Sequence, residues 1–403
     1  MAKFVRLGDV ATSSYGLTAS ATSENTGSRF LRITDIVNGK PGSYDSTPFV
    51  ETGDVDISKF ELKRGDIVIA RTGATVGTTH WFSGWTEPVL FASYLVRFAP
   101  KADVVSSRFL SYVLRSRSWN EHVYATAYAK SAQPNMSARA MAEYQFSLPS
   151  LSQQRQISEL LGSLDDKIAA NQTAVSTGTE LLMSLYRRIQ KHAAEPFGQV
   201  CDVFGGSTPS TKIDEYWGGS INWATPTDLT ALQGPWLTDT ERKITEAGLQ
   251  SMSSALHPSG SILMTSRATI GRVAVAATPV TTNQGFIVIR ASEELTPWVF
   301  CQLQDRVREF EAWSNGATFL EISRGNFKKL PFYRAEPQDL AEFNAKAKPL
   351  LEMCKAKQEE NFTLTKTRDE LLPLLMNGKI TVREASQEAA AVGAAISSEE
   401  NEV

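Results

Sequence analysis

Cysteine is scarce in this sequence, with only Cys201, Cys301 and Cys354 among 403 residues. These cysteines are odd in number, far apart and never arranged as Cys-x-x-Cys, which argues against both a disulfide framework and a thiolate zinc site. Reduced thiols of this kind are typical of cytoplasmic proteins. Long apolar runs are also missing, and residues 1–10 contain no apolar segment of a secretion signal. We therefore expect a cytoplasmic protein without a membrane span.

Catalytic motifs are absent as well. The four histidines, His80, His122, His192 and His257, do not fall in a metal-binding spacing such as His-Glu-x-x-His. The sequence has no Gly-x-Ser-x-Gly elbow, no Walker loop, no Gly-x-Gly-x-x-Gly loop and no Asn/Asp-Pro-Pro-aromatic motif of a DNA methyltransferase. We expect a chain that holds no cofactor or metal and does not methylate DNA by itself.

Charge of one sign is not in excess. The chain has 41 basic and 44 acidic side chains, a net charge of -3, and no polybasic tract. Residues 1–150 carry 16 basic and 13 acidic side chains, and residues 197–335 carry 12 and 13. Composition alone therefore leaves the partner open. A near-neutral globule should bind DNA weakly alone, because neutralised phosphates supply much of the affinity.

The sequence does contain an internal repeat, which predicts a duplicated architecture. Four phrases recur in the same order: Leu7–Val10 with Val200–Val203, Leu31–Ile36 with Trp223–Leu229, Gly65–Gly77 with Gly260–Gly271, and Ala132–Ser137 with Thr318–Ser323. Each copy begins with about 150 residues of short β-branched and aromatic runs broken by Gly, Pro, Asn and Asp. This pattern predicts a mixed α/β globule with many short strands.

A long helical pattern follows each globule. Apolar residues recur at steps of four and three, with Asn171 and Gly178 in the seam of the first helix and Asn361 in that of the second. We expect the two helices to pair as an antiparallel coiled coil; the alternative is that each packs on its own globule. Pro349 should kink the second helix or end a first short one. Residues 384–403 are rich in Ala, Glu and Ser and predict a disordered acidic tail.

Two carboxylate patterns keep a metal-dependent nuclease open as an alternative. Asp45 with Glu61 and Lys63 matches Asp…Glu-x-Lys, in which carboxylates hold a metal and the lysine assists the attacking water. Asp228 with Glu241 and Lys243 matches it again, but at a different place in the repeat.

A surface suited to DNA is the better-supported prediction. Glycines let the backbone approach a polyanion, and threonine hydroxyls can bond to phosphate oxygens. An arginine guanidinium can donate two hydrogen bonds to the edge of guanine, and the side-chain amides of Asn and Gln can bond to adenine. The candidates in the first copy are Arg71, Thr72, Thr75, Lys130, Ser131 and Gln133, with Thr78, Thr79 and Asn135 beside them. Those in the second copy are Arg267, Thr269, Asn283, Gln284, Asn326 and Lys328, with Arg272 and Lys329 beside them. We match Arg71 with Arg267 in the repeat.

The sequence resembles the specificity subunits of type I restriction–modification systems. The strongest similarity is Leu148-Pro149-Ser150-Leu151-Ser152-Gln153-Gln154-Arg155-Gln156-Ile157, which leads to Leu164-Asp165-Asp166-Lys167-Ile168. Tyr216–Trp223 is similar to the opening of a target recognition domain. Asn361, Arg368-Asp369 and Leu371-Leu372-Pro373 are similar to the C-terminal conserved region. The second copy departs where Glu336–Leu340 replaces the Gln-Gln-Arg phrase.

This resemblance implies a non-catalytic subunit with a pseudo-twofold fold. Residues 1–150 and 197–335 would be target recognition domains that each read one part of a split, asymmetric site in double-stranded DNA. Residues 151–196 and 336–383 would be helical spacers that dock two methyltransferase subunits, which carry S-adenosylmethionine, and residues 384–403 the tail. Restriction subunits would complete the complex. A stand-alone nuclease and a coiled-coil adaptor that binds proteins remain the alternatives.

Overall fold

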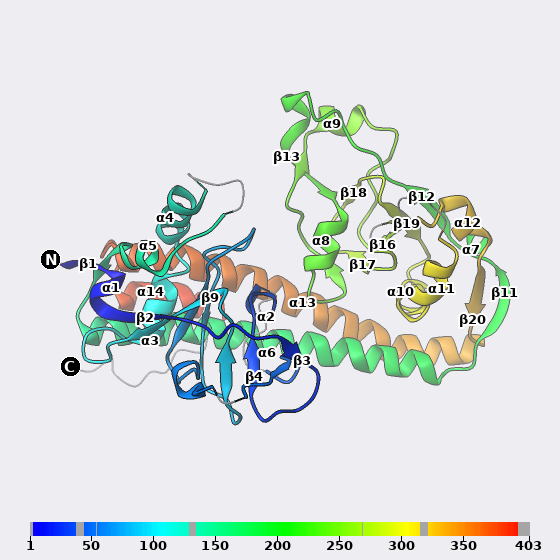
Figure 1. Cartoon of the computed structure of the whole chain (residues 1–403). Coiled ribbons are helices and arrows are strands. Elements are labelled where there is room, and N and C mark those ends of the chain that lie inside the picture. The colour runs from blue at the N-terminus through cyan, green and yellow to red at the C-terminus, as the bar shows by residue number, and fades with distance from the viewer. Residues whose placement is uncertain are drawn as a thin grey trace. The chain divides into compact units, whose positions relative to one another are not determined.

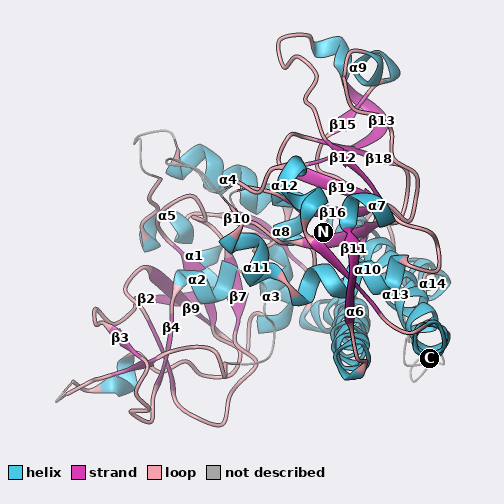
Figure 2. Cartoon of the chain, turned by 90° about the vertical axis from the view of Figure 1, so that its right-hand side faces the viewer, coloured by secondary structure: helices cyan, strands magenta, loops and turns pink. Residues whose placement is uncertain are grey.

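The computed structural model describes residues 3–37, 44–53, 55–128, 134–267, 269–314 and 321–393. The chain forms two compact units, unit 1 with residues 1–167 and 364–403, and unit 2 with residues 168–363. Among the helices of the described residues, none is long and apolar enough to cross a membrane. Figure 2 shows that each unit mixes short strands with short helices, as the sequence predicts.

Unit 1 has two four-stranded sheets and a two-stranded ribbon. The sheets have the orders β2-β9-β6-β7 and β3-β5-β4-β8, and β1 pairs with β10. The elements are β1 (Lys3–Arg6), α1 (Leu7–Val10), β2 (Ala11–Tyr15), β3 (Ala21–Thr22), β4 (Arg29–Leu31), α2 (Ile33–Val37), β5 (Phe49–Val50), the 3₁₀ helix η1 (Ile57–Lys59), β6 (Ile67–Ala70), β7 (Thr79–Trp81), β8 (Val89–Phe91), β9 (Leu95–Pro100), α3 (Ser107–Val113), α4 (Arg117–Ala127), α5 (Ala138–Ala142) and β10 (Gln145–Leu148).

Unit 2 repeats this topology with one strand more in its first sheet and one strand fewer in its second. Its sheets have the orders β12-β19-β16-β17-β14 and β15-β13-β18, and β11 pairs with β20. The elements are β11 (His192–Pro196), α7 (Phe197–Val200), β12 (Asp202–Gly205), the 3₁₀ helix η2 (Asp214–Tyr216), β13 (Trp217–Ala224), α8 (Pro226–Ala231), β14 (Trp236–Leu237), β15 (Lys243–Ile244), α9 (Glu246–Gln250), β16 (Ile262–Thr265), β17 (Val273–Ala276), β18 (Val280–Thr282), β19 (Phe286–Arg290), α10 (Thr296–Asp305), α11 (Val307–Ala312), α12 (Arg324–Lys329) and β20 (Pro331–Arg334).

The central strands of the two units follow directly from their sequences. Both β6 and β16 are short apolar runs that are buried along their whole length, as expected for strands covered on both faces. The Thr-Asp phrase of the repeat has a capping role. Asp35 accepts the N–H of Arg32 at 2.8 Å and Asp228 accepts that of Thr225 at 2.7 Å, so each carboxylate fixes the start of a short helix.

The first repeated phrase is out of register by three residues. We matched Leu7–Val10 with Val200–Val203, but α1 is equivalent to α7. The N–H of Leu7 bonds to the carbonyl of Tyr144 at 2.8 Å, and the N–H of Phe197 makes the same bond to Leu330 at 2.9 Å. The two phrases are therefore similar in sequence but not equivalent in the fold, since Leu7 and Phe197 fill the same buried position.

Two long helices pack against each other, as the seam pattern predicts. They are α6 (Leu151–Arg188) and α13 (Pro337–Met376), and Figure 1 shows them side by side. In unit 2, Asn171 donates from Nδ2 to Oδ1 of Asn361 at 3.0 Å. Seven residues later, a Cβ on Gly178 would lie 3.1 Å from Sγ of Cys354. Rising numbers in α6 thus meet falling numbers in α13, and the pairing is antiparallel.

The motifs that carry the family resemblance have structural roles in unit 1. Ser150 and Gln153 form a reciprocal cap at the start of α6, with bonds of 3.2 and 3.3 Å. Gln154 is buried and accepts the N–H of Ser106 at 2.8 Å. Asp165 accepts the hydroxyl of Tyr112 at 2.8 Å and Nη1 of Arg368 at 2.7 Å. This carboxylate therefore ties α3 and α13 to α6.

Two features at the C-terminal end differ from expectation. The helix α13 runs without interruption through Pro349, so this residue does not end a short first helix. Ala347 and Leu351 on either side are buried, and their packing offsets the missing backbone hydrogen bond. Where the sequence predicts a disordered tail from residue 384, the structure has the helix α14 (Val382–Ala391), which Thr381 and Glu384 cap reciprocally. Residues 394–403 lie outside the described residues.

Candidate nucleic-acid interface

Three segments of unit 1 meet where β6 ends. The N–H of Arg71 bonds to the carbonyl of Tyr94 at 3.0 Å, and the carbonyl of Arg71 accepts the N–H of Met136 at 2.8 Å. Next to it, Thr72 and Asn135 form an antiparallel bridge. Candidate residues from distant parts of the sequence therefore come together on one short backbone frame. Lys130, Ser131 and Gln133 lie outside the described residues, in the segment just before this bridge.

The same frame is built in unit 2 where β16 ends. The N–H of Ser266 bonds to the carbonyl of Gly285 at 2.8 Å, and the carbonyl of Ser266 accepts the N–H of Ile322 at 2.9 Å. Arg267 and Glu321 form the bridge. This frame brings Arg267 to the turn that contains Asn283 and Gln284.

The two frames correct the match of Arg71 with Arg267. By backbone hydrogen bonding Arg71 is equivalent to Ser266, and Arg267 is equivalent to Thr72. The two arginines stand one position apart, because Arg71 directly follows the end of β6 at Ala70, whereas Arg267 comes two residues after the end of β16 at Thr265. A shift of one residue in extended backbone moves a side chain to the opposite face.

Arg71 is held in place without an acidic partner among the described residues. Its guanidinium carbon lies 4.9 Å from the centre of the Tyr15 ring, and its Nε is buried with no hydrogen-bond acceptor among those residues. The hydroxyl of Tyr15 accepts the N–H of Ala138 at 3.1 Å, which fixes the ring. A cation held this way is prepared for an acceptor from outside the chain.

The polar residues of unit 2 are partly committed to the fold. Oδ1 of Asn283 accepts the N–H of Gly285 at 2.8 Å, and Oε1 of Gln284 accepts the hydroxyl of Thr208 at 2.6 Å. Each amide keeps its nitrogen donors for other use. The guanidinium of Arg267 has no hydrogen bond or ion pair to another residue in the described ranges, and its Nε lies 3.4 Å from the place of a Cβ on Gly285.

The remaining candidates lie in different places. Thr75 is half-buried in the loop after β6, and Thr269 is exposed in the equivalent loop after β16. Asn326 lies in the first turn of α12, where its N–H bonds to Oγ of Ser323 at 3.1 Å. Lys328 lies in the last turn of α12, and its Cβ is 3.0 Å from the place of a Cβ on Gly198 in α7. The structure therefore does not bring Lys328 onto the frame of Arg267.

Sequence reasoning missed Tyr15, Tyr94 and Arg324. Tyr15 and Tyr94 are 45% and 62% exposed, unusual for large aromatic side chains, and both belong to the frame of unit 1. Nη1 of Arg324 lies 3.8 Å from the place of a Cβ on Gly205. Only the proximity of Arg324 to the candidate Asn326 signalled it in the sequence.

The two carboxylate patterns do not form metal sites. Both oxygens of Asp228 accept hydrogen bonds, Oδ2 at the start of α8 and Oδ1 from the N–H of Glu241 at 2.9 Å. Glu61 pairs with Lys63 at 2.8 Å. Across the described part of the chain, no group of three or more His, Cys, Asp or Glu side chains is placed to hold a metal ion.

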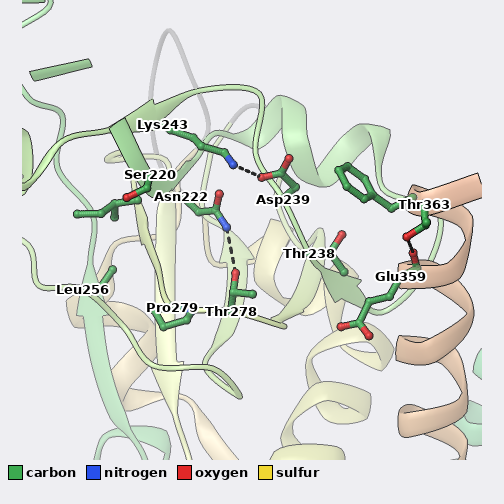
Figure 3. A pocket seen from close by; sticks show the side chains of 12 residues that line it. Ser220, Asn222, Thr238, Asp239, Lys243, Leu256, Thr278, Pro279, Glu359 and Thr363 are labelled. Atoms are coloured by element: carbon green, nitrogen blue, oxygen red, sulfur yellow. Dashed lines mark hydrogen bonds and ion pairs between the residues drawn. The ribbon is translucent and has the colours of Figure 1, made fainter. Parts of the chain in front are cut away.

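Unit 2 also has a cavity of about 590 Å³ beside α13. Asn222, Thr278, Asp239 and Lys243 line it, and Figure 3 shows that they bond to one another in pairs, Asn222 to Thr278 at 3.0 Å and Lys243 to Asp239 at 2.9 Å. None of the candidate DNA-binding residues lines this cavity. These four polar groups therefore satisfy each other in pairs.

Comparison with known proteins places these features in one family. The family model for the type I restriction modification DNA specificity domain matches residues 2–176 and 196–333. The MjaIX specificity subunit of Methanocaldococcus jannaschii is 35% identical over 173 residues, which cover 42% of this chain and 40% of that protein. The HindI specificity subunit of Haemophilus influenzae is 19% identical over 84% of this chain and 95% of that protein.

A solved structure shows the same fold. The S subunit of a type I restriction-modification system from M. genitalium is 13% identical, with a TM-score of 0.56 over 93% of this chain and 96% of that one. With matches to both repeats, the chain belongs to the type I restriction modification DNA specificity domain family and carries this domain twice.

Proposed function

We propose that this chain is the specificity subunit of a type I restriction–modification complex. Residues 1–150 and 197–335 act as target recognition domains, each reading one part of a split, asymmetric site in double-stranded DNA. Methyl transfer belongs to two methyltransferase subunits that carry S-adenosylmethionine, and cleavage belongs to restriction subunits. The chain contributes recognition and assembly, needs no cofactor of its own, and works in the cytoplasm.

The duplicated frame carries this proposal. In each unit the end of the central strand, a turn and the segment before a short helix are joined by the same pattern of backbone hydrogen bonds. The side chains on the two frames nevertheless differ. Arg71 and Thr72 stand where Ser266 and Arg267 stand in the other unit. A constant backbone with variable polar side chains is what two readers of two different half-sites require.

The long helices suit the roles of spacer and dock. Residues 151–196 and 336–383 contain α6 with 38 residues and α13 with 40, about 57 and 60 Å of helix. A fixed helical pair sets the separation at which two readers meet the grooves of DNA. Leu181 on α6 and Phe362 on α13 are about half exposed, which supports a protein partner along these helices.

The charge balance supports a division of labour in DNA binding. Residues 197–335 carry 12 basic and 13 acidic side chains, too little positive charge for tight binding to phosphates. We infer that the partner subunits supply most of the basic surface. The isolated chain should therefore bind DNA weakly, and tight sequence-specific binding by the chain alone would contradict this inference.

The test is to purify the tagged full-length chain from its native host and to count what remains bound. We expect a methyltransferase at two copies per chain. In a second preparation, the double variant Leu181→Ser with Phe362→Ser should retain the fold and lose part of the bound partner. A chain that is recovered alone and cuts DNA with magnesium would support the nuclease alternative, and an unrelated protein partner would support the adaptor.

A further inference from the structure

The two frames permit a comparison of the units position by position. Tyr94 and Gly285 both offer their carbonyl oxygen to the residue that directly follows the central strand. Thr72 and Arg267 both form the bridge to the segment before the last short helix. The backbone is therefore the same at these positions, and differences between the side chains do not arise from differences in fold.

At the first pair of positions unit 1 has a tyrosine, and unit 2 has a glycine with an arginine beside it. Unit 1 has Tyr94, 62% exposed, whose carbonyl accepts the N–H of Arg71, and the short side chain of Thr72 follows Arg71 in the chain. Unit 2 has Gly285, and the guanidinium of Arg267 lies beside it, with Nε 3.4 Å from the place of the missing Cβ. The glycine leaves open the space that the arginine uses. We call these four residues subsite A.

A second place in the frames has the same difference between tyrosine and glycine, and there the guanidinium of Arg71 lies over the tyrosine ring in unit 1. Tyr15 pairs with Val96 in unit 1, and Gly205 pairs with Ile287 at the equivalent position of unit 2. Where the tyrosine is missing, Nη1 of Arg324 lies 3.8 Å from the place of the Cβ on Gly205. Arg324 is the first residue of α12, and the residue at that position of α5 is Ala138. Twice, a glycine in unit 2 replaces a tyrosine and an arginine lies beside it.

Chemistry distinguishes what the two versions of subsite A recognise. A guanidinium donates two parallel hydrogen bonds to O6 and N7 of guanine, whereas a tyrosine ring offers an apolar face. Arg267 has no acceptor among the described residues, so its donors remain for a ligand. A solvated surface arginine would not require a glycine beside it, and the paired replacements at two places make independent drift a poor explanation.

We propose that Arg267 reads a guanine in the half-site of unit 2 and that Tyr94 prevents this readout at the equivalent position of unit 1. This inference rests on the proposed function and adds to it the residue that determines one base. Subsite A is thus the place where the two halves of the DNA target are made different.

The test transfers the arginine version of subsite A to unit 1. The double variant Tyr94→Gly with Thr72→Arg is made in the full chain, produced together with the type I methyltransferase of the host, and the methylated adenines of the DNA are mapped. We expect one position in the half-site of unit 1 to acquire a preference for guanine of about tenfold or more, while the half-site of unit 2 stays unchanged. This direction is chosen because it removes a side chain, whereas a Cβ on Gly285 would lie 3.0 Å from Asn283 and Pro226.

A second variant keeps the inference testable if the double variant does not fold. Arg267→Gln should relax one guanine in the half-site of unit 2 by about tenfold or more and leave the other half alone. The matched control, Arg308→Gln, removes the same charge from an exposed position of α11 and should change no base.

The outcomes separate the inference from the proposed function. The inference is overturned if the half-site of unit 2 contains no guanine, or if neither variant changes the base read in its half. If the wild-type complex methylates no defined sequence, the proposed function itself fails, and the inference fails with it.

Discussion

The asparagine pair between the long helices provides a sharp test of how unit 2 is held together. Nδ2 of Asn171 donates to Oδ1 of Asn361 at 3.0 Å, and Nδ2 of Asn361 donates to the carbonyl of Ile168 at 3.2 Å. Asn171 is only 3% exposed. Leucine has the same number of side-chain heavy atoms and the same branching as asparagine, so Asn171→Leu removes the hydrogen bond without leaving a cavity.

The magnitude follows from the group that loses its partner. In Asn171→Leu, Oδ1 of Asn361 stays in the seam without its donor, and a buried unsatisfied polar group costs about 1–3 kcal/mol. Asn361→Leu should cost a similar amount, because Asn171 then has no acceptor. In the double variant both polar groups are gone and two apolar side chains meet. We therefore expect the double variant to cost less than the sum of the singles, by about 1–3 kcal/mol.

The assay is denaturant unfolding of the four proteins, with the free energy of unfolding taken from the transition of unit 2. The control is Thr173→Leu on the exposed side of α6, which should change that free energy by less than about 0.5 kcal/mol. Additive costs for the two asparagine variants would refute the reasoning, because they would mean that the bond between the side chains contributes nothing of its own.

Three further predictions concern single residues. Asp165→Asn should lower the free energy of unfolding of unit 1 by about 1–3 kcal/mol, since the carboxylate accepts Nη1 of Arg368 at 2.7 Å. Unfolding is measured for Asp165→Asn, for Arg368→Met and for the double variant, and a loss in the double variant equal to the sum of the two single losses would contradict the prediction. Gly206→Ala should cost about 4 kcal/mol or more, because its Cβ would lie 2.0 Å from a backbone carbonyl oxygen; limited proteolysis should show unit 2 opened, while Gly325→Ala, whose Cβ would lie 3.9 Å from Oγ of Ser323, should be tolerated. Burial, together with a neighbouring arginine, lowers the pKa of His257 to about 4, so the neutral form is favoured in the folded state. The unfolded state then takes up a proton first as pH falls through about 6.5, and the free energy of unfolding should fall by about 2 kcal/mol between pH 7 and pH 5. His257→Asn should lose that part of the pH dependence in unfolding measured at both pH values, and an unchanged slope would show that this histidine is not responsible.

Features that depend on regular spacing could be predicted from the sequence. The steps of four and three identified both long helices, and the polar interruptions in that pattern placed Asn171 and Asn361 in the seam, where the structure shows them bonded to each other. Gly178 was also placed in the seam correctly, where its missing side chain makes room for Met353 and Cys354. Periodicity is a property of neighbouring residues, so a single sequence contains it in full.

Features that depend on contacts across the chain could not be predicted. The contact that holds Arg71 comes from Tyr15, 56 positions earlier, and nothing in the local sequence links the two. The match of Arg71 with Arg267 is wrong because Arg71 directly follows β6, whereas Ser266 stands between Arg267 and the end of β16. The similarity of residue types suggested one alignment, but backbone hydrogen bonds decide which positions are equivalent, and these cannot be read from the sequence.

Capping explains the helix that the sequence missed near the C-terminus. The composition of residues 384–403 is that of a disordered segment, yet Thr381 and Glu384 form a capping box at the start of α14. Ala385 and Ala389, four positions apart, are buried. Small residues with this spacing can pack closely even where large apolar side chains are lacking, and composition alone does not reveal it.

The most direct test of the account is an exchange of one recognition domain. Residues 197–335 are replaced by the corresponding residues of another family member, and the methylated adenines produced with the host methyltransferase are mapped for the parent and the chimera. We predict a gapped, asymmetric target for the parent, and a chimera that changes one half of it while the other half and the gap stay the same. An unchanged target, or a change in both halves, would contradict the claim that each unit reads its own half-site.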